Sequence, residues 1–120
     1  MTTQVATYRE ASHQLLAQAE TELLAGDLRQ ASEKLWGAAA QTINALAQHR
    51  GWDHYSHHLL IRTVANLVAE TGDSDIDNLF GVAQSLHTNF YENWLLQELI
   101  ENRLRSVQRF LAKLDPMLDD

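Results

Sequence analysis

The chain has 120 residues, of which 45% are hydrophobic and 21% are charged, and its formal net charge at pH 7 is −7. That length suits a single domain spanning 1–120 and allows a core without disulfide or metal staples. The absence of cysteine excludes disulfides, thiol nucleophiles and cysteine-based zinc sites. Nine Lys and Arg against sixteen Asp and Glu argue against extended DNA binding, because phosphate contacts depend on cationic side chains. A nucleotide or a local RNA contact is still compatible with this charge.

Neither a membrane segment nor a secretory signal is expected. No apolar run approaches the length that a bilayer-spanning helix needs. Residues 1–12 also lack the basic segment and apolar stretch that begin a secretory signal. We therefore expect a soluble, cytoplasmic protein.

The first half of the chain predicts two long helices. Apolar side chains recur every three or four residues up to Gly26 and again over 28–50, which places each set on one helical face. Asp27 is suited to cap the start of the second helix. Gly37 stands inside that helix, where glycine costs about 1 kcal/mol relative to alanine. We interpret it as a place where another helix approaches closely.

The middle of the chain predicts two shorter helices. The third begins near Ser56 or His57 and ends at Gly72. The fourth follows at once, with Asp73 or Ser74 as its N-terminal cap, because short polar side chains there accept hydrogen bonds from free backbone N–H groups.

The last segment predicts a fifth helix. Asn89 followed by Glu92 three residues later fits a loose form of the capping box, so this helix is expected to begin near Asn89. Its apolar stripe continues to Leu114, and Pro116 lies just beyond its end. Five amphipathic helices with short connections predict an all-α fold, a single-domain antiparallel bundle, because each apolar stripe needs a neighbour.

Three segments carry a family resemblance. They read Glu-Lys-Leu-Trp-Gly-Ala-Ala at 33–39, Arg-Gly-Trp at 50–52 and Leu-His-Thr-Asn-Phe-Tyr-Glu at 86–92. Together they resemble the PaREP-type archaeal repeat proteins, a small helical family related to the HEPN superfamily. The resemblance runs from about residue 31 to the end of the last helix.

The resemblance implies an HEPN-like bundle of the nucleotidyltransferase substrate-binding type that often dimerises. Many HEPN proteins are toxin–antitoxin partners of a nucleotidyltransferase, and the active ones cut RNA through an Arg-x4–6-His motif. Arg50 and His57, with six residues between them, satisfy that spacing. Active HEPN proteins carry the motif late in the chain, however, and the late region here has no such pair. A non-catalytic member is therefore expected, with a metal-independent RNA endonuclease using Arg50 and His57 as the alternative.

A second candidate site is the predicted turn that holds His87, Asn89, Tyr91 and Glu92. Its imidazole, amide, phenol and carboxylate could bind a nucleotide by hydrogen bonds. The competing interpretation is structural, with Asn89 and Glu92 capping the helix while His87 and Tyr91 cover its rim.

A third cluster contains His54, His57 and His58. Two of these imidazoles could share a helical face and bind a metal ion, but no third ligand is evident and the HExxH pattern is absent. We therefore expect no metal and no cofactor.

Apolar residues left over near Trp94, Leu95 and Leu99 predict a homodimer. The leading hypothesis is a non-catalytic HEPN-like protein that binds a nucleotide or a partner protein, such as a nucleotidyltransferase. A purely structural dimerisation module is a further alternative.

Overall fold

The fold is all-α, as the hydrophobic periodicity predicts. The computed structural model describes residues 1–119. Within that range the chain forms five α-helices and a terminal 3₁₀ turn: α1 (Thr3–Leu24), α2 (Leu28–Arg50), α3 (His57–Thr71), α4 (Asp75–Glu92), α5 (Gln97–Leu114) and η1 (Asp115–Asp119). None of these helices combines the length and the apolar character that a membrane crossing requires.

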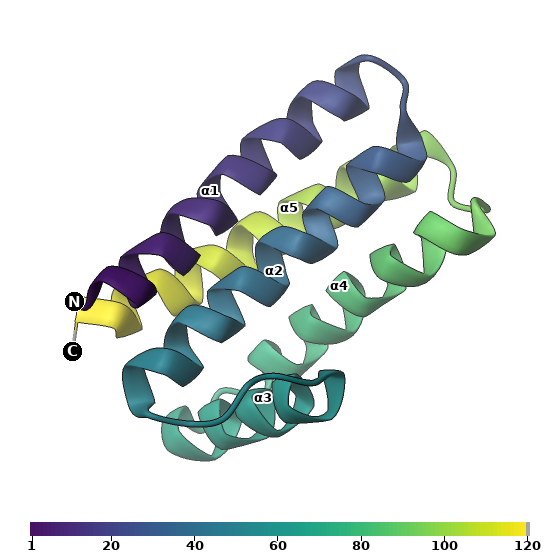
Figure 1. Cartoon of the computed structure of the whole chain (residues 1–120). Coiled ribbons are helices and arrows are strands. Elements are labelled where there is room, and N and C mark those ends of the chain that lie inside the picture. Colours follow the sequence, from purple (N-terminus) through teal and green to yellow (C-terminus); the bar gives the residue numbers. More distant parts are fainter. Residues whose placement is uncertain (120) are drawn as a thin grey trace.

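Helix α2 lies at the centre of the bundle. It contacts the other four helices, and Figure 1 shows it running antiparallel to α1 with α5 behind it and α4 alongside. The shorter α3 lies at the end of the bundle where α2 finishes, and the start of α1 and η1 lie near that end. The core between the helices is fully buried and includes Leu35, Ile43, Leu46, Leu67, Leu86, Ile100, Phe110 and Leu114.

Most of the predicted helix ends are confirmed. The Asp27 side chain accepts a hydrogen bond from the backbone N–H of Gln30, and Ser56 accepts one from Leu59. At α4, Ser74 occupies the cap position without a side-chain hydrogen bond, while Asp73 accepts from the N–H of Asp75. The side chain that satisfies a free N–H group at this end is therefore Asp73.

Gly37 marks a close helix contact, as its position predicts. A Cβ atom built there would lie 3.1 Å from Cδ1 of Leu15 on α1. The missing side chain thus lets α1 and α2 pack closely along their length.

The predicted start of the fifth helix at Asn89 is wrong. Helix α4 continues through Asn89 to Glu92 and stops where Asn93 adopts a left-handed conformation, with φ of 53°. Helix α5 begins only at Gln97. Asparagine tolerates left-handed φ and often follows the last residue of a helix, so Asn93 is the residue that ends α4.

The Asn89 side chain holds the connection between α4 and α5 in place. Its side-chain oxygen accepts hydrogen bonds from the backbone N–H groups of Trp94, at 2.9 Å, and Leu95, at 2.8 Å. Its side-chain nitrogen donates to Ser32 Oγ on α2 at 2.9 Å. The predicted cap of a helix start is in fact a fully buried clamp on a helix end.

Candidate functional site

Arg50 and His57, the candidate endonuclease pair, bond to different partners. Arg50 holds Glu70 through two hydrogen bonds, Nε to Oε1 at 3.1 Å and Nη2 to Oε2 at 2.8 Å. His57 Nε2 lies 3.0 Å from Oε1 of Gln84 on α4. His57 and Glu70 stand near opposite ends of α3, and their separation of thirteen residues corresponds to about 20 Å along the helix axis. The structure therefore does not bring Arg50 and His57 together.

The Arg50–Glu70 pair links the end of α2 to the end of α3. Hydrogen bonds from the Arg50 side chain hold the pKa of the Glu70 carboxyl below its ordinary value, against a smaller opposing effect of burial. A lowered carboxyl pKa stabilises the fold above the unfolded-state pKa and loses that contribution as the pH falls through the folded-state value.

We therefore expect Glu70→Gln to lower the free energy of unfolding at pH 7 by less than about 1 kcal/mol, because the pair is partly exposed. The difference from wild type should vanish as the pH falls below the pKa of Glu70, where the wild-type carboxyl is itself protonated. Urea unfolding at several pH values between 7 and 3 measures this. A difference that stays constant across that range would contradict the assigned role.

His54 is a buried, fully bonded histidine. Its Nδ1 lies 3.1 Å from the carbonyl oxygen of Trp52, and its Nε2 lies 3.2 Å from the hydroxyl of Tyr8 on α1. Nδ1–H therefore donates to the carbonyl, and Nε2 accepts from the tyrosine. This arrangement fixes the 52–56 segment against α1.

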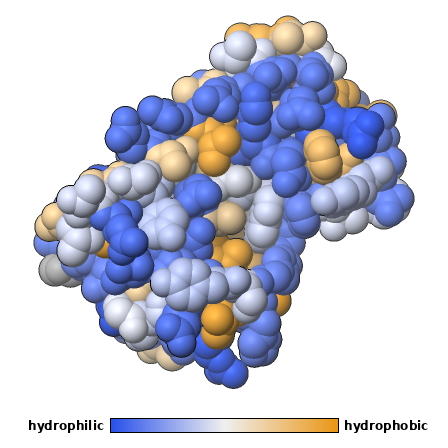
Figure 2. Space-filling model, viewed as in Figure 1, coloured by the Kyte–Doolittle hydropathy of each residue, from blue (hydrophilic) through white to orange (hydrophobic). Residues whose placement is uncertain are grey.

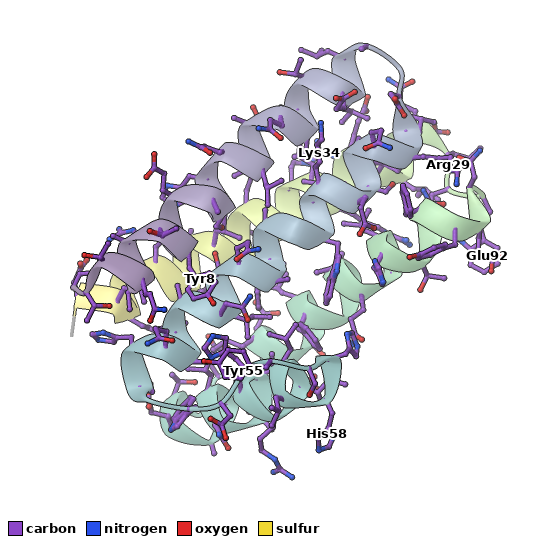
Figure 3. The ribbon with its side chains drawn as sticks, viewed as in Figure 1. Tyr8, Arg29, Lys34, Tyr55, His58 and Glu92 are labelled. Carbon is purple, nitrogen blue, oxygen red and sulfur yellow. The ribbon has the colours of Figure 1, made fainter. Side chains whose placement is uncertain are left out.

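The three histidines do not form a metal site. Within residues 1–119 there is no group of three or more His, Asp or Glu side chains placed to hold a metal ion. His54 is buried, whereas His58 is exposed and points outward from α3 in Figure 3. His57 is directed toward α4 through Gln84.

His87 and Tyr91 lie on the last turns of α4, not on a turn between helices. The His87 imidazole pairs with Glu33 on α2 at 3.0 Å, and its ring centroid lies 5.3 Å from that of Trp36. The Tyr91 ring meets His87 edge-on at 5.5 Å. Of the four predicted ligand-binding residues, Asn89 is fully buried, while Tyr91 and Glu92 are exposed.

A hollow lined by rings is present where α1, α2 and the start of α3 meet. Its volume is about 380 Å³. Figure 2 shows the surface hollowed between α2 and the 52–56 segment, with pale and orange atoms on its floor. Tyr8 and Tyr55, labelled in Figure 3, approach it from two separate segments. The lining consists of Tyr8, Trp36, Ala40, Asn44, His54, Tyr55, Ser56, His57 and Leu60.

The rings around the hollow contact one another. The Tyr55 ring stacks on His54 with centroids 4.7 Å apart and remains 81% exposed. The Trp36 ring centroid lies 5.7 Å from that of His57 and 5.3 Å from that of His87. Trp36 therefore joins two histidines that the sequence placed in separate candidate sites.

One residue of the lining, Asn44, carries a polar atom without a hydrogen-bond partner. The side-chain oxygen of Asn44 is buried and accepts no hydrogen bond within the described chain. Sequence reasoning missed this residue, together with the part played by Tyr8. The available signal was an asparagine in the interior of a long helix, where its propensity is unfavourable.

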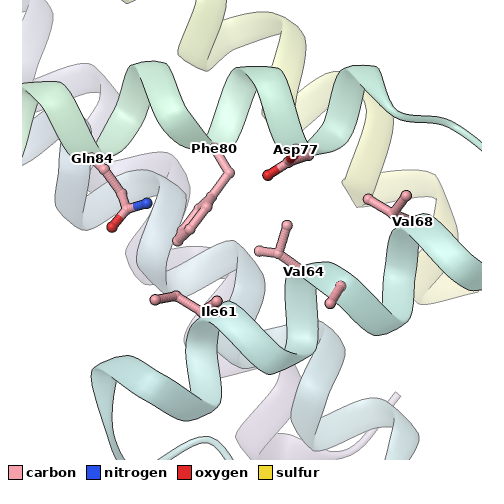
Figure 4. A pocket seen from close by; sticks show the side chains of 7 residues that line it. Ile61, Val64, Val68, Asp77, Phe80 and Gln84 are labelled. Atoms are coloured by element: carbon pink, nitrogen blue, oxygen red, sulfur yellow. The ribbon is translucent and has the colours of Figure 1, made fainter.

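A second hollow, of about 340 Å³, lies between α3 and α4 (Figure 4). Its walls are mainly apolar, with Ile61, Val64 and Val68 on α3 facing Phe80 on α4. It contains fewer groups that could orient a ligand by hydrogen bonds, so the ring-lined hollow is the better candidate site.

The fold and this site define a small five-helix bundle with a ring-lined surface hollow. The chain belongs to the archaeal PaREP1/PaREP8 family, whose model matches residues 7–111. It is also similar to the crystal structure of a protein from Sulfolobus solfataricus, with 23% sequence identity, a TM-score of 0.75 and 98% of each chain covered. That likeness shows the shared fold. No curated protein matches the sequence.

Proposed function

We propose that this protein is a non-catalytic, HEPN-like member of its family that binds a nucleotide and holds the base in the ring-lined hollow. The observation that carries this proposal is the set of planar side chains around one concavity, Tyr8, Trp36, His54, Tyr55 and His57. Stacking on aromatic side chains contributes about 1–3 kcal/mol per base to nucleic-acid binding. A volume of about 380 Å³ is within the usual size of small-ligand sites.

The base is the part of the nucleotide that this hollow would recognise. Its described lining contains five side chains with rings, one amide and the hydroxyls of two tyrosines and a serine, but neither Lys nor Arg. Tight recognition of a phosphate usually relies on such cationic side chains. The sugar and phosphates would therefore extend from the hollow toward solvent.

We expect nucleotides to raise the melting temperature of the wild-type protein, because a ligand that binds only the folded state stabilises it. Tyr55→Ala should remove most of this shift while leaving the melting temperature without ligand nearly unchanged, since Tyr55 is 81% exposed. The measurement is a thermal-shift titration with each of the common nucleotides.

Tyr91→Ala provides the matched control, because Tyr91 is also exposed but lies outside the lining of the hollow. A shift lost in Tyr91→Ala and kept in Tyr55→Ala would move the site to the end of α4, beside His87. The absence of any shift with every nucleotide would reject the proposed function.

The alternative function, an RNA endonuclease, requires Arg50 and His57 to act on one phosphate. Their separate bonds to Glu70 and Gln84 do not favour it. Incubation of a structured RNA with wild type and with His57→Ala tests this alternative. Cleavage by wild type that disappears in the variant would restore it.

We also propose that the protein forms a homodimer through exposed apolar side chains at the α4–α5 connection. Trp94 is 66% exposed and Leu96 59%, and Leu24 on α1 lies beside the start of α5 at the same end of the bundle. We expect light scattering to give the mass of a dimer for wild type and of a monomer for Trp94→Asp. A monomeric wild type at high concentration would reject this arrangement.

A nucleotidyltransferase-type protein is the partner that HEPN-like proteins suggest. Co-purification of this chain with the product of a neighbouring nucleotidyltransferase gene tests the pairing. The failure of the two to co-purify would leave nucleotide binding as the proposed role.

A further inference from the structure

We propose that the hollow between α3 and α4 is a second ligand site, and that it binds a small amphipathic amine with a short apolar chain and one ammonium group. This site is separate from the ring-lined hollow, and it does not depend on nucleotide binding there. The apolar lining of the hollow would hold the chain of the ligand, and the carboxylate of Asp77 would hold its ammonium group.

The hollow offers an apolar surface that water can reach. Its volume of about 340 Å³ is within the usual size of small-ligand sites. Val64 of α3 and Phe80 of α4 are each only 3% exposed, whereas Ile61 is 43% exposed and Ala65 is also exposed. An apolar chain lying between the two helices would cover these exposed side chains, which is favourable in proportion to the apolar area removed from water.

Asp77 is the charged residue among those that line this hollow. It stands in the first turn of α4, and Figure 4 shows its carboxylate on the side of that helix that faces α3. The residue is exposed, so a ligand entering from solvent can reach its side chain. The hollow therefore combines an apolar wall with one accessible negative charge.

The acidic residues next to Asp77 already have cationic partners. Asp75 pairs with Arg109 at 2.8 Å, and Asp73 pairs with Lys113 at 2.8 Å, both partners being on α5. Among residues 1–119, no cationic side chain forms an ion pair with Asp77. A ligand ammonium group would supply this missing partner through a charge-assisted hydrogen bond.

The lining also indicates how many charges the ligand carries. The other polar residue in it is Gln84, two turns further along α4, and its side-chain oxygen is bonded to His57. A second ammonium group would therefore lie against apolar side chains, where an unpaired charge is costly. A monoamine with an apolar chain matches this hollow better than a polyamine does.

The test is a nuclear magnetic resonance titration of the isotope-labelled full chain at pH 7 with four probes: hexylamine, hexanol, hexanoate and ethylamine. We expect hexylamine to shift the backbone resonances of 61–68 and 77–84 most. It should bind about three to five times more tightly than hexanol, because an exposed ion pair contributes up to about that factor. Hexanoate should bind more weakly than hexanol, because Asp77 repels it. Ethylamine should bind at least about tenfold more weakly than hexylamine, because it buries fewer methylene groups.

Two variants with the same change of net charge assign the selectivity to one side chain. Asp77→Asn removes the carboxylate from the hollow. Asp53→Asn is the matched control, because Asp53 is also exposed but does not line this hollow. We expect Asp77→Asn to bind hexylamine and hexanol equally well and Asp53→Asn to keep the preference for hexylamine. Circular dichroism verifies that both variants are folded.

Three results would overturn the proposal. The first is equal affinity of the wild-type protein for hexylamine and hexanol, and the second is resonance changes that lie outside α3 and α4. The third is an equal loss of preference in Asp77→Asn and Asp53→Asn, which would mean that the net charge of −7 attracts the amine without a defined site. None of these results bears on nucleotide binding, which the Tyr55→Ala variant tests separately.

Discussion

Asn89→Leu should lower the free energy of unfolding by about 3 kcal/mol, because it removes the partners of three polar groups at once. The backbone N–H groups of Trp94 and Leu95 would both lose the side-chain oxygen that accepts their hydrogen bonds. Ser32 would lose the amide donor on the opposite side. Leucine has the same number and branching of side-chain heavy atoms as asparagine, so the loss would reflect hydrogen bonds more than a cavity. Urea unfolding followed by circular dichroism measures it.

Two variants determine whether the clamp explains this loss. Ser32→Ala removes one of the three bonds and should cost about 1 kcal/mol. Glu92→Gln changes an exposed side chain three residues away and should change stability by less than about 0.5 kcal/mol. If Asn89→Leu were as stable as Glu92→Gln, Asn89 would not be a structural clamp. The hypothesis that it binds a ligand would then regain support.

Asn89 also shows where sequence reasoning reaches its limit. The pair Asn89 and Glu92 has the spacing of a helix start, and that local pattern is real. The structure uses Asn89 differently because Ser32, 57 residues away, accepts its amide hydrogen. The apolar stripes and the glycines at helix ends predicted the helices correctly, because both signals depend only on residues close together in the sequence. The buried hydrogen bonds of Asn89 depend on contacts between distant segments, and the spacing of residues in the sequence does not predict such contacts.

In the candidate site, too, the sequence indicated individual residues but not the contacts between them. The sequence identified the histidines near residues 54–58 and 87 as unusual, and the structure places both His57 and His87 in contact with Trp36. The sequence did not connect these groups, because α2 and α4 had to be packed side by side first. Tyr8 reaches His54 across 46 residues of sequence. Such a contact becomes visible only once α1 is placed against α2.

Gly37→Leu should lower the free energy of unfolding by about 2 kcal/mol. The new side chain would occupy space now held by Leu15, whose Cδ1 lies 3.1 Å from the position of the first added carbon. Overpacking of this kind costs about 1–3 kcal/mol, and the gain of about 1 kcal/mol in helix propensity offsets only part of it. Thermal and urea unfolding both measure the change.

Gly81→Leu is the matched control for this prediction. Gly81 is also inside a helix, α4, but an added Cβ there would meet no atom within 4 Å. That variant should therefore gain up to about 1 kcal/mol from helix propensity. Adding Leu15→Ala to Gly37→Leu should recover stability relative to the sum of the single changes, because it removes the side chain that clashes. If both glycine variants were equally stabilising, the close approach of α1 and α2 at Gly37 would be refuted.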